Sequence, residues 1–429
     1  MIEPGFNPKY LVTLDEIYHS HWTGRKKRRI GFLKEAVHHF WPEGHPSRLI
    51  QVTGTNGKGS VSHCLHHALR FAGATGSWTG PHVFDYAERF HINGQKPSPD
   101  EVSAVYREVL EPYQLHFMAQ HPGDSLSFAE QGILLALHLF QRHKVVWGIM
   151  EVGAGGRYTP LMALPMVACV LTNVGNDHPK SLGSQLWQRA MDKAGIARPG
   201  VPFFTTARDD ALYYVEETAR SEGAEFMSIG DEAIEKVAVL KPGLPAFKYW
   251  NMALACAVIQ HFHPQQTLSH LLDAMNVRLP GRFASPAPNV IVDVAHNPDK
   301  MARFAEELAN NYPNRKFRFI IGLTRNRDVK AVFQPILPLA SHLVVTDASY
   351  AGRDPKELAG ILGEEFPEVE VISNPQIAYE TEKERAGAED IIVLTGSAYM
   401  IDQAFNPNPY IKHLNATYGW RGGPENGPI

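Results

Sequence analysis

Short apolar runs alternate with amphipathic stretches along the first half of the chain. The apolar run 48–53 ends at Gly54 and predicts a buried strand. From Ser60 to Ala72 apolar residues recur at helical spacing, and Gly73 predicts the end of that helix. Further strands are predicted at 145–152, 166–172 and 201–205, and an apolar helix at 130–142. The alternation of strands and helices predicts a mainly parallel sheet covered by helices on both faces.

A second alternating series begins near Asn289 and predicts a separate α/β domain of about 120–140 residues, a usual domain size. Its predicted strands lie at 290–294, 317–322, 342–346, 369–372 and 390–395, with helical patterns such as 301–310 between them. Pro280 and Gly281 interrupt the chain just before this series. We therefore expect two α/β domains, at 1–279 and 280–429, of which the second is smaller.

The 429-residue chain has 44% hydrophobic and 20% charged residues, which is typical of a globular protein with two or three domains. No apolar run approaches the roughly 20 residues that cross a bilayer, so a membrane protein is not expected. The formal net charge of -4 gives no general basic field for nucleic acid. The basic run 24–29 is a local exception. We interpret it as a solvated helix face, with a site for an anionic substrate tail as the alternative.

The cysteines lie far apart in apolar segments, which favours buried, reduced thiols and a cytoplasmic protein. They are Cys64, Cys169 and Cys256. The first residues lack the basic and apolar regions of a secretory signal. Histidine is plentiful, with 21 residues, but no spacing typical of a zinc site occurs. The histidine pairs at 38–39 and 66–67 are therefore expected on helix surfaces.

The strongest functional signal is a glycine-rich loop between the first predicted strand and the first predicted helix. It reads Gly54-Thr55-Asn56-Gly57-Lys58-Gly59-Ser60. Glycines let backbone N–H groups approach phosphate, the helix N-terminus favours negative charge, and Lys58 supplies a compact cation. Gly59 stands where Ser or Thr usually follows the lysine, and the hydroxyl comes one place later, at Ser60. The pattern predicts an ATP phosphate-binding loop, and the alternative is a glycine-rich turn without nucleotide.

Polar residues lie at the ends of the next two predicted strands. Glu151 comes at the end of the strand 145–152, and Asp177 and His178 follow the strand 166–172. In an open parallel sheet, ligands bind beyond the carboxyl ends of the strands. Glutamate is a hard oxygen donor that suits Mg²⁺, whereas a histidine ligand indicates tolerance of Mn²⁺. Together they predict a metal site beside the phosphates, although either residue alone is more typical of a structural role.

Six further motifs follow the phosphate loop in a fixed order, and the whole pattern spans roughly residues 15 to 405. They are Pro81-His82 with Glu88-Arg89 and Ile92-Asn93-Gly94, then Glu151-Val152-Gly153-Ala154-Gly155-Gly156-Arg157, Thr172–His178, Lys193-Ala194-Gly195-Ile196, Pro280-Gly281-Arg282-Phe283 and Asp293-Val294-Ala295-His296-Asn297-Pro298. In this order the motifs resemble the folylpolyglutamate synthase and dihydrofolate synthase family of the Mur ligase superfamily.

The resemblance implies an enzyme with two Mur-ligase-type domains. The N-terminal phosphate-loop domain would hold ATP and a carboxylic acid, and the Rossmann-like C-terminal domain would bring the amino acid and part of the nucleotide site. Family members use Mg²⁺, convert a carboxylate into an acyl phosphate, and let the amine of glutamate attack it. We accordingly expect ATP and one or two Mg²⁺ ions as cofactors, with Mn²⁺ as a substitute. Small-molecule substrates and a monomer are expected, with no nucleic-acid or membrane partner.

Carried over by position, the resemblance assigns roles in both domains. The nucleotide would contact the loop Gly54–Ser60, Asn251 on the adenine side, Arg282 and Asp293. Metal would be held by Ser60, Glu151, His178 and Lys193, the last of which many family members carry as a carbamate that supports a second Mg²⁺. The catalytic residues would be Lys58, Lys193 and His296. Two alternatives stay open: Arg282 as a hinge arginine held by salt bridges, and Lys193 as an ordinary exposed helix lysine.

Three departures from the family pattern lie near the acid substrate and the metal. Gly80 replaces a Ser that commonly ligates Mg²⁺, with Thr79 or a water as its substitute. The segment 158–161 reads Tyr-Thr-Pro-Leu, where the family normally has Leu-Asp-Ala-Thr-Asn and uses it to hold a pterin. Asn176 replaces a Leu. The acid is therefore predicted to be a folate or dihydropteroate-type acid, or a non-folate acid that stacks on Tyr158.

Two other classes of protein remain as alternatives. An ordinary small-molecule kinase is disfavoured, because the motifs at 280–283 and 293–298 have no role in such an enzyme. A nucleotide-binding regulatory protein that has lost catalysis is favoured only by the missing Ser at Gly80. Release of ADP and phosphate that depends on both an acid and an amine would distinguish the ligase from both alternatives.

Overall fold

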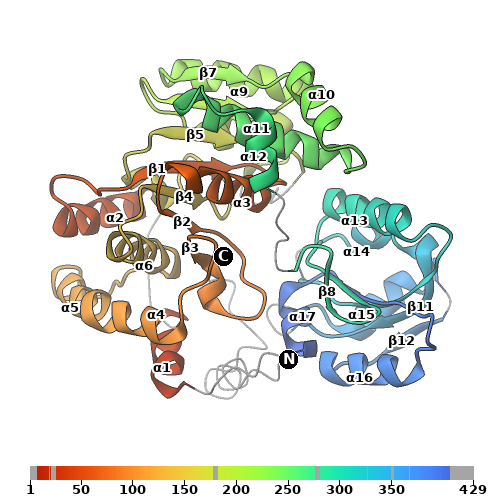
Figure 1. Cartoon of the computed structure of the whole chain (residues 1–429). Helices are drawn as coiled ribbons and strands as arrows, with labels where there is room; N and C mark the ends of the chain where they lie inside the picture. Colours follow the sequence, from red (N-terminus) through yellow and green to blue (C-terminus); the bar gives the residue numbers. More distant parts are fainter. Residues whose placement is uncertain are drawn as a thin grey trace. The chain divides into compact units, whose positions relative to one another are not determined.

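The computed structural model describes residues 7–18, 20, 26–176, 182–275, 281–325, 327–348, 352–366 and 368–405. The chain divides into two compact units, each with its own sheet (Figure 1). Of the described residues, those within 7–82 and 86–275 form the N-terminal unit, and Val83–Asp85 join those within 281–405 in the C-terminal unit. The predicted boundary between residues 279 and 280 lies outside the described residues.

The N-terminal unit is built on a seven-stranded sheet with the strand order β3-β2-β4-β1-β5-β6-β7. Its strands are β1 (Arg48–Thr53), β2 (Thr75–Trp78), β3 (Phe90–Ile92), β4 (Trp147–Glu151), β5 (Ala168–Leu171), β6 (Pro202–Thr205) and β7 (Glu225–Ser228). Only β2 and β3 pair antiparallel, and the other neighbours are parallel. The predicted mainly parallel sheet and each of its predicted strands are confirmed.

Helices cover both faces of this sheet. They are α1 (Pro8–Tyr18), α2 (Lys26–Phe40), α3 (Lys58–Ala68), α4 (Pro99–Val105), α5 (Glu111–Gln120), α6 (Phe128–Arg142), α8 (Leu186–Ala194), α9 (Asp209–Ser221), α10 (Asp231–Leu240), α11 (Ala246–Phe262) and α12 (Leu268–Ala274). Ile149 of β4 packs into the core formed with α3 and α11. Its neighbour Gly148 points the other way, toward Phe140 of α6. Alternate residues of a strand face opposite sides, so α3 and α6 cover opposite faces.

The register of the central strands sets the position of the site. Val52 of β1 pairs with Glu151 of β4, and Thr53 of β1 pairs with Leu171 of β5. The three strands are parallel, so their carboxyl ends meet at one edge of the sheet. The glycine-rich loop, Glu151 and the chain after β5 consequently lie side by side.

The C-terminal unit has a six-stranded sheet with the order β12-β11-β10-β13-β9-β8, antiparallel only between β8 and β9. Its strands are β8 (Ala284–Ala287), β9 (Val290–Asp293), β10 (Phe317–Ile321), β11 (Ala340–Val345), β12 (Val369–Val371) and β13 (Ile392–Thr395). Its helices are α13 (Pro298–Asn311), α14 (Val329–Phe333), α15 (Pro355–Leu362), α16 (Pro375–Arg385) and α17 (Ala398–Phe405). Separate apolar cores form with α13, α14 and α15 and with α16 and α17, so this sheet too is covered on both faces.

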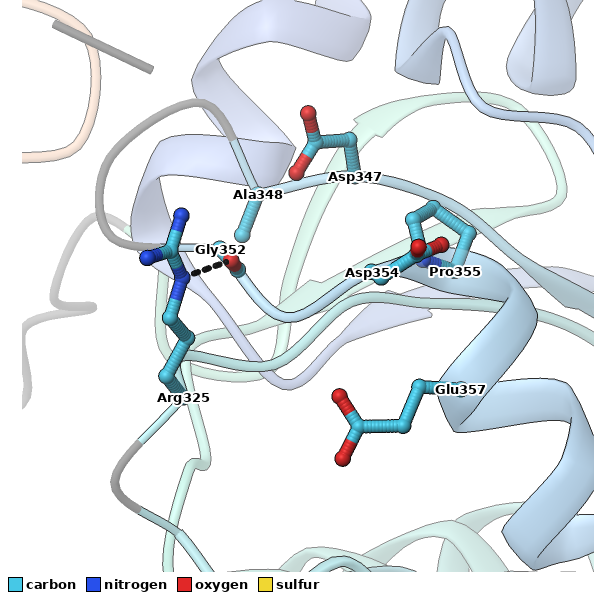
Figure 2. Close-up of a pocket in the computed structure, with 7 residues that line it drawn as sticks. All are labelled: Arg325, Asp347, Ala348, Gly352, Asp354, Pro355 and Glu357. Atoms are coloured by element: carbon cyan, nitrogen blue, oxygen red, sulfur yellow. Dashed lines mark hydrogen bonds between the residues drawn. The ribbon is translucent and has the colours of Figure 1, made fainter. Parts of the chain in front are cut away.

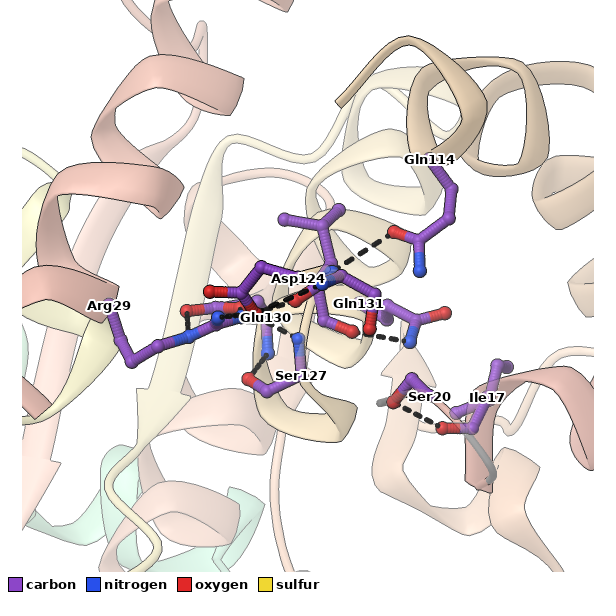
Figure 3. Close-up of polar contacts among 10 residues, drawn as sticks. Ile17, Ser20, Arg29, Gln114, Asp124, Ser127, Glu130 and Gln131 are labelled. Atoms are coloured by element: carbon purple, nitrogen blue, oxygen red, sulfur yellow. Dashed lines mark hydrogen bonds and ion pairs between the residues drawn. The ribbon is translucent and has the colours of Figure 1, made fainter. Parts of the chain in front are cut away.

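The prediction of a solvated helix face for the basic run 24–29 is wrong at Arg29. Its guanidinium is buried and bonds to Glu130 (Nε to Oε1, 2.9 Å) and to Asp124 (Nη1 to Oδ1, 2.8 Å), as Figure 3 shows. Glu130 also accepts from the backbone N–H of Ser127 at the start of α6. A buried guanidinium needs such partners, and Arg29 thereby ties α2 to the N-terminus of α6.

The expected surface position of the histidine pairs is confirmed for His38 and His39 and wrong for the other pair. His66 is fully buried, and His67 is half-buried. Both lie on α3, on the side of this helix that faces β2 and β3. The strands therefore cover these two histidines. Among the described residues, no helix combines the length and the apolar character required to span a membrane.

Candidate functional site

The phosphate loop has a conformation that only glycine accommodates at two positions. Gly54 and Gly57 have φ angles of 143° and 84°, where residues with a Cβ are strained. A Cβ on Gly54 would lie 1.9 Å from Oγ1 of Thr172, and one on Gly57 would lie 2.5 Å from Oδ1 of Asn251. The structure therefore brings Asn251, a buried residue of α11, against the loop.

The loop is bonded to the chain that follows β5. The Thr172 hydroxyl donates to the carbonyl of Asn56 (2.6 Å), and the N–H of Asn56 donates to Oδ1 of Asn173 (3.0 Å). Oγ1 of Thr55 accepts from the N–H of Gly175 (2.8 Å). These bonds fix the backbone before any ligand binds, which lowers the cost of ordering it around phosphate.

Two lysines converge on this loop. Nζ of Lys58 donates to the carbonyl of Gly54 (2.9 Å), and so does Nζ of Lys193 (3.2 Å). Lys193 lies on α8 and is only 2% exposed, so it is not the exposed helix lysine that was the alternative. The structure therefore brings the two predicted catalytic lysines to one carbonyl of the loop.

Gly156 allows the helix that carries Lys193 to approach the glycine-rich loop. A Cβ on Gly156 would lie 2.6 Å from the carbonyl oxygens of both Asp192 and Lys193. The N–H of Arg157 donates to the carbonyl of Asp192 (2.8 Å). The glycine-rich segment after Glu151 thus packs directly on the last turn of α8.

Replacement of Lys193 with Ala is expected to lower kcat/KM by about 10–100-fold, as when a group supporting a metal site is lost. If Lys193 acts as a carbamate, acetate should restore part of the activity, because a carboxylate can take the place of the lost anion. Full activity of Lys193→Ala, together with an unmodified Lys193 in the mass spectrum of the intact protein, would contradict this prediction.

Glu151 has the position expected of a metal ligand. Its side chain is buried at the end of β4, where Oε2 accepts from the N–H of Gly80 (3.1 Å). The same oxygen lies 3.6 Å from the point a Cβ on Gly59 would occupy, so the carboxylate faces the first turn of α3. Ser60 lies half-buried in that turn. The other predicted ligand, His178, lies outside the described residues.

Gly80, at the position where the resemblance predicts a Ser, lies against an arginine. A Cβ on Gly80 would lie 2.8 Å from Nη1 of Arg89. Nε of Arg89 donates to Nδ1 of His82 (2.9 Å), whose Nε2 therefore carries the proton and donates to the Tyr18 hydroxyl (3.0 Å). Burial and the Arg89 charge hold the pKa of His82 well below its usual value. The arginine also lies over the ring of Phe128, 4.9 Å from its centroid.

Sequence reasoning missed two members of this site. The sequence places Arg89 in a motif but predicts neither its bond to His82 nor its contact with Phe128. Arg189 is buried on α8, where it donates to the carbonyls of Gly175 (2.9 Å) and Gly183 (3.1 Å). Arginine is usually exposed, and nothing in the sequence of α8 indicates that this one is buried, so only the fold reveals this role.

The predicted C-terminal residues form a second group, within the C-terminal unit. Asp293 ends β9 and accepts from the N–H groups of Phe283 (2.9 Å) and Ala295 (2.8 Å). Burial raises its pKa, and the nearby Arg282 opposes that effect. His296 bonds through Nδ1 to the carbonyl of Val294 (2.8 Å). The structure thus brings Arg282, Asp293 and His296 into one cluster.

His296 is a neutral imidazole. Burial and the charge of Lys300 hold its pKa well below the usual value. Because Nδ1 faces a carbonyl, it carries the proton, and Nε2 accepts from Nζ of Lys300 at 3.2 Å. In this state His296 offers an acceptor nitrogen and no positive charge.

A cavity of about 330 Å³ opens in the C-terminal unit beyond β10 and β11. It is lined by Arg325, Asp347, Ala348, Gly352, Asp354, Pro355 and Glu357 (Figure 2). Nε of Arg325 donates to the carbonyl of Gly352 (2.9 Å), which holds the guanidinium at the rim. The cavity lies at the carboxyl ends of parallel strands, where open α/β sheets bind ligands.

Comparison with known proteins matches both units. The family described as Mur ligase, glutamate ligase domain, matches residues 281–398. The dihydrofolate synthase/folylpolyglutamate synthase of Bacillus subtilis is 24% identical, covering 83% of this chain and 90% of the relative. A probable bifunctional folylpolyglutamate synthase/dihydropteroate synthase of Haloferax volcanii is 27% identical over 83% of this chain, which spans 45% of that relative.

Solved structures show the same fold. Mycobacterium tuberculosis folylpolyglutamate synthase complexed with ADP matches with a TM-score of 0.81 and 24% identity, covering 92% of this chain and 97% of the other. The bifunctional folylpolyglutamate synthase/dihydrofolate synthase of Yersinia pestis, complexed with AMPPNP and a Mn ion, matches with a TM-score of 0.77 and 24% identity, covering 95% and 97%. The expected pair of α/β domains is thereby confirmed.

Proposed function

We propose, on the premise that this chain belongs to the folylpolyglutamate synthase and dihydrofolate synthase family of the Mur ligase superfamily, that it is an ATP-dependent amide ligase. It activates a carboxylate as an acyl phosphate and couples it to an amino acid, namely glutamate to a folate or dihydropteroate-type acid. The observation that carries the proposal is the phosphate loop on which Lys58 and Lys193 converge beside Glu151.

The chemistry follows from the charges at this edge of the sheet. A carboxylate is a poor electrophile, and transfer of the γ-phosphoryl group to its oxygen creates a leaving group while ADP departs. The amine then attacks the carbonyl carbon, the C–O bond to phosphate breaks, and the nitrogen loses a proton. Lys58 and the N–H groups of the loop would stabilise the charge on the transferring phosphoryl group, while Lys193, as a carbamate, would support a metal ion.

The residues at this edge also fit Mg²⁺. Glu151 offers a buried carboxylate oxygen, and Ser60 offers a hydroxyl in the adjacent turn, which are the hard donors that Mg²⁺ prefers. When bound, Mg²⁺ would neutralise part of the phosphate charge. Glu151 would orient the ion through the oxygen that also accepts from Gly80.

The test is an assay of ADP and inorganic phosphate release with dihydropteroate, tetrahydrofolate and unrelated aryl acids, each paired with a panel of amino acids. The proposal expects release only when an acid and an amine are both present, in equal amounts with the amide formed. ATP binding without turnover of any pair would favour a nucleotide-binding regulatory protein instead.

A non-folate acid is the second candidate substrate. Thr159 stands where the resemblance predicts the pterin-holding Asp, so the carboxylate acceptor is missing, and the neighbouring Tyr158 is 45% exposed and offers an aromatic surface. A ligand whose donors become buried without partners loses about 1–3 kcal/mol for each. A kcat/KM for dihydropteroate or a folate at or above about 10⁴ M⁻¹s⁻¹, the lower end of the usual range, would reject this candidate.

The cavity of Figure 2 is proposed to receive the amino acid. Arg325 can pair with a carboxylate, and Asp347 and Asp354 can pair with an ammonium group, so the lining complements an α-amino acid. Arg325→Ala should therefore raise the KM for the amino acid by roughly 10–100-fold, since a hydrogen bond to a charged group contributes about 1.5–3 kcal/mol. The KM for ATP should not change. As a matched control, Lys330→Ala removes an exposed cation of the same unit, and an equal effect of both variants would contradict the assignment.

A further inference from the structure

Three histidines lie together on the face of α3 that is turned toward β3. His63 and His67 are four residues apart on the helix, a spacing that places both rings on one side, with centroids 4.3 Å apart. His91 of β3 stands opposite, with its centroid 6.0 Å from that of His63. None of the motifs that define the ligase site uses these rings.

The free nitrogens of these rings have no hydrogen-bond partner. Within the described part of the chain, Nε2 of His63, Nε2 of His67 and Nδ1 of His91 are buried and unpaired. A buried polar atom without a partner is unfavourable, and a bound ion would provide one. In His66, the fourth ring, Nδ1 is also buried and unpaired, but Nε2 accepts from the N–H of Gly94 (2.8 Å), so this ring already has a structural role.

We propose that His63, His67 and His91 bind one divalent transition-metal ion such as Zn²⁺, at a site separate from the phosphate loop. Zn²⁺, Ni²⁺ and Cu²⁺ bind well to imidazole nitrogens, whereas Mg²⁺ prefers oxygen ligands. His63 and His67 form a chelating pair on one helix, and His91 adds a third nitrogen from the facing strand.

Two charged side chains lie near these rings. The exposed cations Arg70 and Lys96 lie nearby and oppose a positive ion. Solvent and salt screen that repulsion because both side chains are exposed.

Binding requires the rings to rotate about their side-chain bonds. Among the described residues, three donor atoms already within 4.8 Å of one another occur only at His342, Glu370 and Glu382. That group carries no metal proposal, because Arg318 pairs with Glu382 and Arg385 pairs with Glu370. The carboxylates there are neutralised by guanidinium groups, whereas the α3 histidines have no such partners.

The experiment titrates the full chain, without affinity tag or nucleotide, with Co²⁺ and Zn²⁺ after treatment with a chelator. We expect one ion per chain, cobalt d–d bands without thiolate charge transfer, and no displacement by excess Mg²⁺. His67→Gln and His91→Gln should each weaken binding at least about 10-fold, the lower end of the loss for groups that support a metal. Both positions are half-buried, so these variants avoid the fully packed core.

The matched control is His38→Gln, which removes an exposed histidine of α2 and should leave the affinity unchanged. Melting temperatures of all variants identify any loss of folding. Several results would overturn the proposal: a dissociation constant weaker than about 1 mM, unchanged affinity in His67→Gln, a thiolate band from a cysteine, or competition by Mg²⁺. Ligase activity is not part of the readout, so the outcome is independent of the proposed function.

Discussion

Replacement of Lys58 with Ala is expected to lower kcat/KM by on the order of 10²–10³, the cost of removing one preorganised donor that stabilises developing charge. Nζ of Lys58 already donates to the carbonyls of Gly54 (2.9 Å) and Thr55 (3.4 Å), so the ammonium is held over the phosphate loop. The substitution leaves the glycine conformations of the loop in place. The variant should therefore keep its fold but lose phosphoryl transfer.

The measurement is steady-state kinetics of ADP release, combined with ATP binding and melting temperature for each variant. Lys34→Ala is the matched control, because Lys34 is an exposed lysine of α2 in the same unit. Near wild-type turnover of Lys58→Ala would remove the phosphate loop from the mechanism. A large loss of melting temperature would instead assign Lys58 a role in folding.

Local pattern was sufficient for the central strands and for the phosphate loop. The strand β1 carries Leu49, Ile50 and Val52, and Gly54 and a helix start follow directly, so the signal is purely local. The same approach missed β2, whose sequence Thr-Gly-Ser-Trp is not an apolar run. Gly76 is there because Phe140 packs on it, as a Cβ would lie 2.4 Å from that ring. A glycine that is required by the packing of a side chain 64 positions away does not follow the hydrophobic periodicity of the local sequence.

The site divides in the same way. Motif order located Lys58, Glu151 and Lys193, but it did not predict that both lysines bond to one carbonyl. The exchange of Ser for Gly80 looked like a lost metal ligand, whereas the structure couples it to the position of Arg89. Such pairings depend on residues brought together by the fold, and a single sequence does not display them.

The C-terminal unit gives a third example. Val83 belongs to its apolar core although the chain on either side folds into the N-terminal unit. A Cβ on Gly281 would lie 2.7 Å from Cγ2 of Val83. A short excursion of three residues has no composition that distinguishes it from a loop, so contiguous domain ranges read from the sequence did not separate it.

Arg29→Met should destabilise the N-terminal unit by about 3–5 kcal/mol, the usual cost of removing one partner from a buried ion pair. The substitution leaves the carboxylates of Asp124 and Glu130 buried, with side chains only 3% and 0% exposed, and without the guanidinium that bonds to both. Methionine has a similar length and no charge. The loss of stability would therefore come mainly from the two carboxylates left without a counter-charge, and less from a cavity at the position of the arginine (Figure 3).

Thermal unfolding measures this effect, since each kcal/mol lowers the Tm of a unit of this size by roughly 2–4 °C. The matched control is Arg107→Met, because Arg107 pairs with Glu16 and Glu111 but is 33% exposed. Exposed ion pairs contribute about 0–1 kcal/mol, so the control should change the Tm by only a few degrees. If both variants melted at the same temperature, the buried network would have no special role. A selective loss in Arg29→Met would show that this arginine, which the sequence presents as one of a run of surface charges, holds α2 against the N-terminus of α6.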